Sequence, residues 1–251
     1  MLTSFPDGYR AAVIGASGGI GAALTAALHN DARCGAVYAL SRTPDTRAAS
    51  TEDTGRLIAL RADYDALSSL TAAAAEIEAG GPLHIAIIAT GLLHDGDRVA
   101  PEKDWRHITA EQMARVLHVN TIGPSLVAQA FLPLMPKDGR SVLAALGARV
   151  GSIGDNGIGG WYSYRASKAA LAMIIKSLAI ELARKKRATI AVALHPGTVD
   201  TGLSEPFQAN TRAGQVVPPA KAAADLLHVI DGLDVGSSGG HFAYDGQRIG
   251  P

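Results

Sequence analysis

The sequence predicts an α/β fold in which one doubly wound parallel sheet carries helices on both faces. Short apolar runs alternate with longer Ala- and Leu-rich segments along the 251 residues. A glycine-rich turn, Gly15 to Gly21, joins the first apolar run to the first helical segment. The run from His84 to Ala89 is almost entirely apolar, as in a parallel strand covered on both faces. Strands and helices that alternate in this way predict one Rossmann-type domain over residues 1–251.

Composition narrows the classes of partner. Lys plus Arg and Asp plus Glu both number 23, so no overall field attracts nucleic acid or an anionic membrane. No apolar run reaches the roughly 18 residues that span a bilayer, and residues 1–10 lack the pattern of a signal peptide. The single cysteine, Cys34, is expected to be a small buried or turn residue without a zinc site. These features favour the cytoplasm and no metal.

The expected elements follow the hydrophobic pattern. Strands are expected at 10–14, 36–40, 57–60, 84–89, 141–146, 189–194 and 241–244. Helices are expected from the glycine turn to about residue 30, and over 66–79, 111–132, 169–183 and 220–230. Residues 44–55 are polar and predict a surface loop, 92–106 an irregular charged loop, and 204–217 a mobile lid. The basic run 184–187 is interpreted as cations at a helix C-terminus rather than a nucleic-acid site.

The glycine turn indicates a pyrophosphate site. Glycines let the backbone turn sharply and approach a phosphate, and the helix that follows offers free N–H groups. The spacing G-x-x-x-G-x-G differs from the commoner dinucleotide pattern, and any tight strand–helix corner could use it. The second strand ends in Ser41-Arg42, where an acid would hold the ribose of NAD. Arg42 could pair with a 2′-phosphate instead, or be a solvated loop residue. Asp63 is placed either at the adenine or as a helix N-cap.

Tyr164 and Lys168 are the strongest candidates for chemistry. They lie four residues apart near the start of a long predicted helix, so they project from one face. A nearby ammonium favours phenolate and is expected to lower the pKa of the phenol. A tyrosine tuned in this way can donate or accept a proton. The alternative is two residues on a solvated helix face. Asn120 lies inside a predicted helix, where asparagine is mildly unfavourable; a structural residue on the outer face is its alternative.

Four motifs in this order resemble the short-chain dehydrogenase/reductase family: Gly15–Gly21, Asn120, Tyr164–Lys168 and Pro196-Gly197. The resemblance covers essentially the whole chain. Finer features are similar to the C-factor-type branch, namely the stretches 101–103, 148–153, 159–168 and 195–201. The resemblance implies an oxidoreductase that moves a hydride between a nicotinamide dinucleotide and a small carbonyl or alcohol substrate. It also implies a homodimer or homotetramer.

The resemblance assigns roles to individual residues. Tyr164 would be the general acid or base, Lys168 would lower its pKa and hold the nicotinamide ribose, and Asn120 would anchor a relay water. The cofactor would be NADP(H), favoured over NAD(H) because of Arg42. The residues expected to bind it are Gly15, Ser17, Gly19, Ile20, Gly21, Ser41, Arg42, Asp63, Thr90, Gly91, Tyr164, Lys168, Pro196, Gly197 and Thr198.

Two departures from the family pattern stand out. Ala89-Thr90-Gly91 replaces the usual Asn-Ala-Gly, which mostly supports the sheet. Gly147 stands where a substrate-polarising serine is expected at the end of the fifth strand, and Ser152 is the nearest candidate to replace it. The main prediction is an NADP(H)-dependent oxidoreductase that is slow. The alternative is a dinucleotide-binding signalling or regulatory protein with little turnover.

Overall fold

A seven-stranded parallel sheet forms the centre of the protein. The computed structural model describes residues 2–44, 55–185, 187–210 and 216–251. The strand order is β3-β2-β1-β4-β5-β6-β9, and every pairing in the sheet is parallel, as the sequence predicts. The strands are β1 (Tyr9–Ile14), β2 (Cys34–Ser41), β3 (Leu57–Arg61), β4 (Ile85–Ile88), β5 (Ser141–Leu146), β6 (Thr189–His195) and β9 (His241–Ala243).

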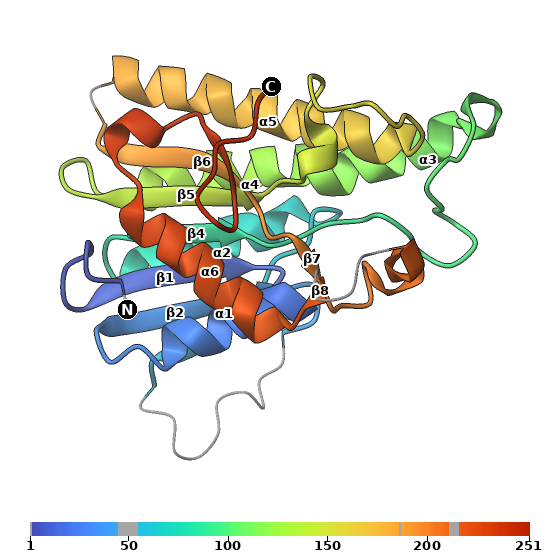
Figure 1. Cartoon of the computed structure of the whole chain (residues 1–251). Helices are drawn as coiled ribbons and strands as arrows, with labels where there is room; N and C mark the ends of the chain where they lie inside the picture. Colours follow the sequence, from blue (N-terminus) through green and yellow to red (C-terminus); the bar gives the residue numbers. More distant parts are fainter. Residues whose placement is uncertain (1, 45–54, 186, 211–215) are drawn as a thin grey trace.

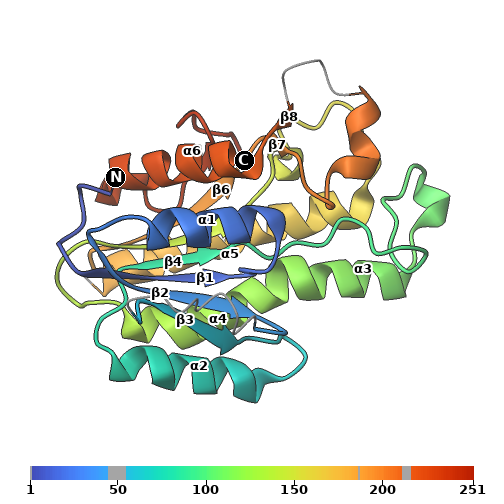
Figure 2. The same ribbon diagram turned by 90° about the horizontal axis from the view of Figure 1, so that it is seen from below.

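Helices cover both faces of this sheet, and Figures 1 and 2 show the three layers. They are α1 (Gly19–His29), α2 (Leu67–Ala79), α3 (Ala110–Leu117), α4 (Gly123–Phe131), α5 (Tyr162–Arg184) and α6 (Pro219–Gly232). Alternate residues of each strand enter two separate cores. Ala11 and Val13 pack with α1 and α6, whereas Ala12 and Ile14 pack with α2, α4 and α5. The doubly wound prediction is therefore confirmed.

The crevice of such a fold lies where the strand order reverses. Here the chain goes outward from β1 to β3 and then returns to place β4 on the other side of β1. The carboxyl ends of β1 and β4 therefore lie side by side with loops that diverge from each other. This geometry fixes the position of the site before any side chain is considered.

One predicted helix is interrupted. The expected helix over 111–132 is α3 followed by a π-helical turn at His118–Ile122 and then by α4. Asn120 lies in that π turn and is fully buried. π turns inside helices are frequent at functional sites because they redirect a side chain. The interpretation of Asn120 as an outer-face residue is therefore wrong.

Several smaller expectations can be compared with the structure. Cys34 is a free, buried residue of β2, as expected. Arg187 donates to the carbonyls of Leu132 and Met135, which gives part of the basic run 184–187 a structural use. The predicted lid contains the short helix η6 (Glu205–Asn210), and the short strands β7 (Thr198–Val199) and β8 (Val216–Val217) pair beside it. Residues 45–54, 186 and 211–215, which include most of the predicted surface loop, lie outside the described residues.

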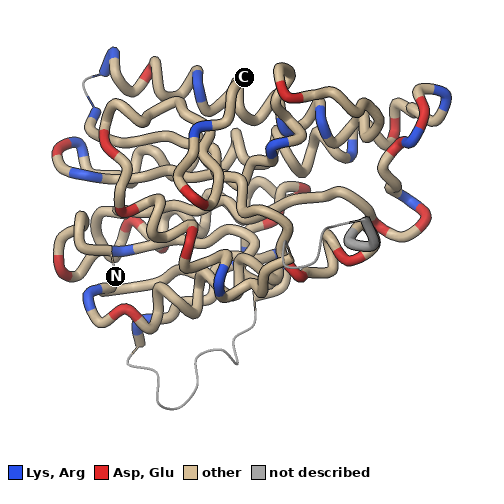
Figure 3. The backbone as a smooth tube through the Cα atoms, in the orientation of Figure 1, with Lys and Arg blue, Asp and Glu red and all other residues tan. Residues whose placement is uncertain are grey.

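The charge and hydropathy of the described residues bear on the expectations from composition. Lys and Arg are interspersed with Asp and Glu along the part of the backbone that Figure 3 colours. Within the described ranges no helix has both the length and the apolarity needed to cross a bilayer.

Candidate active site

The glycine turn between β1 and α1 is shaped by close backbone approaches. Gly15 adopts a φ of +92°, which only glycine tolerates well. A Cβ at Gly21 would collide with the carbonyl of Gly15, and one at Gly19 would lie 2.5 Å from the methyl of Thr201. No side chain caps the start of α1. The turn therefore has the compact backbone and uncapped helix start that suit a phosphate group.

A cavity of about 410 Å³ opens beside this turn, at the carboxyl ends of β1 to β4. It brings together seven of the residues predicted to bind a dinucleotide: Gly15, Ser17, Ser41, Arg42, Asp63, Thr90 and Gly91. Gly19, Ile20 and Gly21 belong to the adjoining turn and first turn of α1. Pro196, Gly197 and Thr198 follow β6, outside the lining of this cavity, and Gly197 packs its φ of +78° backbone against the ring of Tyr244. The cavity therefore brings part of the predicted set together, and the remaining residues lie outside its lining.

The cavity also contains residues that the sequence analysis did not identify: Tyr64, Asp65, His94, Arg98, Arg115 and His118. The Tyr64 hydroxyl lies 2.8 Å from the hydroxyl of Thr90, and a Cβ at Gly123 would collide with its ring. Tyr64 therefore fills the space between the end of β4 and the start of α4. Its position next to Asp63 was the only available signal.

Arg42 is exposed at the rim of the cavity, whereas Ser41 is buried. The carboxylate of Asp63 accepts hydrogen bonds from the Arg61 guanidinium and from the amide of Asp65, both at 3.1 Å. These two hydrogen bonds hold the pKa of Asp63 below its usual range. The Asp63 carboxylate is therefore ionised near neutral pH and already paired with Arg61.

Lys168, Asn120 and Gly91 converge on one point from three elements. A Cβ at Gly91 would lie 3.9 Å from Lys168 Nζ and 4.0 Å from Asn120 Oδ1. Asn120 Oδ1 accepts from the amide of Leu92 at 2.7 Å, and its Nδ2 donates to the Leu92 carbonyl at 2.9 Å. Asn120 therefore holds the chain just after β4, and Gly91 lies next to both Asn120 and the ammonium of Lys168.

The tyrosine and the lysine lie on one face of α5, as the spacing predicts. Lys168 Nζ is 5.7 Å from the centre of the Tyr164 ring and donates to the carbonyl of Leu146 at 2.7 Å. Burial lowers the pKa of Lys168 to about 8 and raises the pKa of Tyr164 to about 12. The expected lowering of the tyrosine pKa is wrong for this geometry, because burial dominates and the ammonium is directed toward a backbone carbonyl. Tyr164 is therefore protonated at neutral pH, the form that a general acid requires.

The first turn of α5 is held by a buried carboxylate. Glu102, only 3% exposed, accepts hydrogen bonds from the amide and hydroxyl of Ser163 and from the side chain of Gln112. Its backbone carbonyl accepts from the amide of Trp161 at 2.6 Å. These bonds hold the pKa of Glu102 below its usual range despite burial. An anion at the N-terminus of a helix is favourable, so Glu102 fixes the turn that carries Tyr164.

A side chain at Gly147, where the family pattern would place one, would require the ring of His241 to shift. Its amide donates to the carbonyl of Leu194 at 2.8 Å, so the chain still pairs with β6 at this point. A Cβ would lie 2.8 Å from Nε2 of His241 and 3.4 Å from Ala193. A serine hydroxyl at 147 would therefore press on His241. None of the residues from Leu146 to Gly151 carries a hydroxyl, so the strand end has no substitute of its own.

The hydroxyl of Ser152, the predicted substitute for the missing serine, makes two hydrogen bonds within the protein. Its hydroxyl donates to the carbonyl of Pro251 at 3.1 Å and accepts from the amide of Asp155 at 3.2 Å. It lines a second cavity of about 300 Å³ formed with Met173 and Lys176 of α5 and with residues 248–251. The first bond ties its loop to Pro251 and the second lies within the loop, so the hydroxyl is already engaged and the geometry gives no support to Ser152 as a substrate donor.

Comparison with known proteins identifies the family. The pattern described as short chain dehydrogenase matches residues 10–212. The chain belongs to this family. It is 35% identical over 137 residues to the C-signal of Myxococcus xanthus, which covers 55% of this chain and 77% of that protein. It is 28% identical over 254 residues to an uncharacterized oxidoreductase of Schizosaccharomyces pombe, covering 94% and 96% of the two chains. These relatives place this short-chain dehydrogenase, an oxidoreductase, in the C-factor-type branch.

A solved structure has the same fold. The NADPH-bound carbonyl reductase from chicken fatty liver superposes with a TM-score of 0.83 over 98% of this chain and 100% of the other, at 24% identity. At that identity the likeness concerns the fold alone. The family binds a nicotinamide dinucleotide, NAD or NADP, and the cavity at the ends of β1 to β4 lies where a Rossmann-type sheet places it.

Proposed function

We propose that this short-chain dehydrogenase is a single-domain, NADP(H)-dependent oxidoreductase that interconverts a carbonyl compound and an alcohol. The observation that carries the proposal is the meeting of Lys168 and Asn120 at Gly91, with Tyr164 on the same face of α5 as Lys168. This point adjoins the cavity at the ends of β1 to β4, because Gly91 lines that cavity. A proton donor therefore lies near the cavity in which we expect the dinucleotide to bind.

The residues present fit a nicotinamide dinucleotide. In the turn from Gly15 to Gly21 the backbone segments pack so closely that side chains would collide with them. No side chain caps the start of α1, so its N–H groups can face a phosphate. Gly15, Ser17, Gly19, Ile20 and Gly21 would hold the pyrophosphate. The remaining contacts would come from Ser41, Arg42, Asp63, Thr90, Gly91, Lys168, Pro196, Gly197 and Thr198. When bound, the cofactor supplies or accepts the hydride.

Each catalytic side chain has one task in this proposal. Tyr164 donates its phenolic proton to the carbonyl oxygen, since its raised pKa keeps it protonated. Lys168, positively charged below about pH 8, holds the ribose and favours the phenolate that forms. Asn120 is a positioning residue that fixes the chain at Leu92 and anchors a relay water.

Arg42 supports NADP(H) over NAD(H). It follows the buried end of β2 and lies exposed at the rim of the cavity, with no acid at 41 or 42. An exposed guanidinium suits a 2′-phosphate, because it can make charge-assisted bonds with two oxygens. The NADPH-bound carbonyl reductase of similar fold is consistent with this preference.

A second function, a dinucleotide-binding signal or regulator with little turnover, has its own supporting observation. No hydroxyl lies between Leu146 and Gly151, and Ser152 is engaged elsewhere. A relative in the same branch is named C-signal. Loss of one donor for the developing oxyanion slows such reactions by about 10²–10³. We therefore expect the enzyme to be slow, and the regulator to be the outcome if turnover is absent.

One experiment separates the two functions. NADPH oxidation is followed against a panel of aldehydes and ketones, and NADP⁺ and NAD⁺ binding is measured in parallel by calorimetry. Turnover above the Tyr164→Phe background supports the enzyme. Tight NADP⁺ binding with no turnover on any member of the panel overturns it and favours the regulator.

The assembly and setting are also proposals. We expect a homodimer or homotetramer in the cytoplasm, with a small-molecule substrate and with neither nucleic acid nor a membrane as partner. Light scattering after size exclusion tests the assembly, since a monomer at working concentration would contradict it.

A further inference from the structure

Four rings from three separate segments form a chain that ends at Tyr164. The Trp161 ring lies edge-on to Tyr164 with centroids 6.2 Å apart, and edge-on to Phe207 at 5.1 Å. Phe207, in η6, lies 5.7 Å from the ring of His94 in the loop after β4. Edge-to-face pairs at these separations are mutually favourable. The rings therefore hold three loops together at the catalytic phenol.

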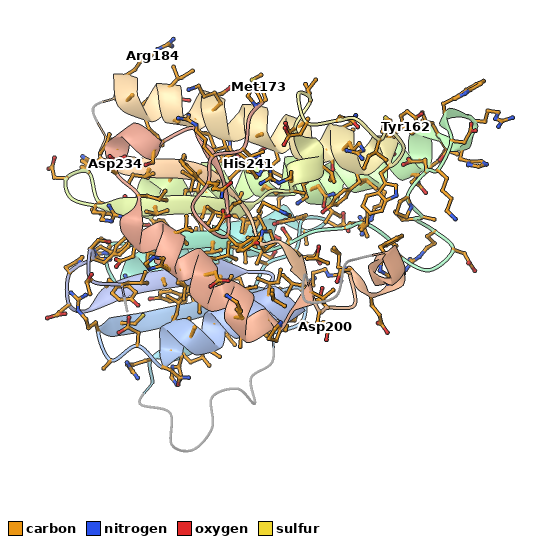
Figure 4. All side chains as sticks on the ribbon, in the orientation of Figure 1. Tyr162, Met173, Arg184, Asp200, Asp234 and His241 are labelled. Atoms are coloured by element: carbon orange, nitrogen blue, oxygen red, sulfur yellow. The ribbon has the colours of Figure 1, made fainter. Side chains whose placement is uncertain are left out.

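These loops lie at the same end of the sheet. In Figure 1 the coil of η6 and the start of α5 both lie toward the carboxyl ends of the strands. Figure 4 shows Tyr162, at the start of α5, and Asp200, just before η6, on that side, with Arg184 at the far end. His94 Nε2 lies 2.8 Å from the carbonyl of Gly202, which joins the segment before η6 to the loop after β4. This hydrogen bond joins the same two segments that the ring contact between His94 and Phe207 joins.

The backbone of Trp161 adopts a conformation that is unfavourable for a residue with a side chain. It is the one non-glycine residue of the described ranges with a positive φ, at +51°. The two residues before it, Gly159 and Gly160, take φ values of +71° and +66° without strain. Such strain persists where the surroundings fix it and is concentrated at functional sites. The Trp161 amide is fixed by the Glu102 carbonyl at 2.6 Å, so the ring is held where a glycine would have fitted the backbone.

One apolar side chain lies near the point where Lys168 and Asn120 meet, since a methyl of Leu203 is 3.6 Å from the position that a Cβ on Gly91 would take. Ile158, in the loop before Trp161, is 92% exposed. The faces of Trp161 and Phe207 offer no hydrogen-bond acceptor, so a polyhydroxylated substrate would leave most of its hydroxyls unpaired there. An apolar substrate group would remove the exposed parts of these two rings from water, which is favourable.

We propose that Trp161 and Phe207 form the wall of the substrate subsite and that the substrate is a ketone or aldehyde carrying an aryl group. The aryl ring packs against Trp161 and Phe207, and its carbonyl oxygen faces the Tyr164 hydroxyl. This inference rests on the proposed function. NADPH would supply the hydride to the carbonyl carbon, and Tyr164 would give its proton to the oxygen and become the phenolate, so the products would be NADP⁺ and the aryl-substituted alcohol.

The test uses Trp161 as its own reporter. The chain has two tryptophans, and Trp105 is 68% exposed, so Trp105→Phe leaves Trp161 as the single fluorophore. In this variant, with saturating NADPH so that neither alcohol can be oxidised, quenching is titrated with 1-phenylethanol and with its saturated match, 1-cyclohexylethanol. We expect the aryl alcohol to bind about three- to tenfold more tightly, the range of one or two ring contacts. Equal dissociation constants for the two alcohols would overturn the inference.

Phe207→Leu in the same background keeps an apolar side chain and removes the ring. It is expected to abolish the aryl preference while the NADP⁺ dissociation constant stays unchanged. Ile158→Ala, a highly exposed change in the neighbouring loop, is the matched control and should leave the preference intact. A preference that survives Phe207→Leu would contradict the assignment of the wall to that ring.

Turnover separates this inference from the proposed function. Acetophenone and cyclohexyl methyl ketone are compared as substrates, and Phe207→Leu should raise KM for the first alone. If neither ketone nor any other carbonyl is reduced but the aryl alcohol still binds more tightly, the proposed reaction fails and the subsite stands. If both ketones are reduced with equal kcat/KM, the reaction stands and the aryl wall is rejected.

Discussion

The two sides of the cleft differ in whether backbone or side chains shape them. The side at the ends of β1 to β4 is shaped by backbone, with Gly15 at positive φ and Gly21 packed on its carbonyl. The side at the end of β5 and the start of α5 is shaped by side chains, namely the buried Glu102 and the ring of Trp161. A backbone cradle accepts any ligand with a pyrophosphate, whereas a side-chain wall discriminates. We infer that the first side binds the cofactor and that the second decides what is reduced.

The largest effect is expected from a change at Lys168, because we expect this residue to act in both cofactor binding and catalysis. Replacing the buried Lys168 with Met should lower turnover about 10²-fold or more and weaken NADP⁺ binding. The same change should raise the free energy of unfolding at pH 7 by up to about 3 kcal/mol, because a buried ammonium with a pKa near 8 is removed. Denaturant titration and NADPH oxidation measure the two effects.

The stability gained by Lys168→Met is expected to depend on pH. Between about pH 8 and the unfolded pKa near 10.4, the unfolded chain binds more protons than the folded one, so stability of the unmodified protein rises with pH. The advantage of Lys168→Met should therefore be full below pH 8 and shrink toward pH 10. The rate of reduction should also fall as pH rises through about 8. A pH-independent difference would show that the lysine is not desolvated.

Arg42 tests the cofactor side alone. Arg42→Asp should reverse the preference from NADPH to NADH, because one charge-assisted contact is worth about 1.5–3 kcal/mol, or roughly tenfold to a hundredfold. The ratio of the dissociation constants for the aryl and the saturated alcohol should be unchanged in Arg42→Asp. Arg184→Asp, an exposed change at the far end of α5, serves as the control. Equal affinity of the unmodified protein for NADPH and NADH would refute the role of Arg42.

A change at Glu102 tests the substrate side of the cleft, because Glu102 holds the first turn of α5 in place. Glu102→Gln keeps the shape but weakens the bonds to Ser163 and Gln112, so we expect a loss of about 1–3 kcal/mol of stability. Because its pKa is lowered in the folded state, this stabilisation is present above about pH 4.5 and is lost as pH falls. A lower kcat with unchanged NADP⁺ affinity marks a positioning role. Glu111→Gln, an exposed change in α3, is the control.

The smallest expected effect is at Gly147. Gly147→Ser should not raise kcat, because the new side chain meets His241 Nε2, and it should cost about 1–3 kcal/mol of stability. The double change Gly147→Ser with His241→Ala should recover the stability that the single change loses. A Gly147→Ser variant that is faster and as stable as the unmodified protein would show that the serine position is available after all.

The same contrast explains what could be predicted from the sequence. The sheet, the glycine turn and the cavity residues from Gly15 to Gly91 follow local rules, because apolar runs, glycine spacing and strand ends are written in short stretches. The substrate side depends on residues far apart in the chain. The bond from Ser163 to Glu102 joins positions 61 residues apart, and Ser152 reaches Pro251 across 99 residues. The tyrosine pKa also required burial, which spacing alone does not give.

The central claim is that Tyr164 donates the proton, and Tyr164→Phe tests it most directly. The change keeps the ring that packs on Trp161 and removes only the hydroxyl. Single-turnover NADPH oxidation is measured with the best carbonyl substrate, together with NADP⁺ affinity. The account predicts that the rate falls about 10²–10⁴-fold while NADP⁺ affinity and Tm are unchanged. A Tyr164→Phe variant that reduces the substrate at the normal rate would contradict it.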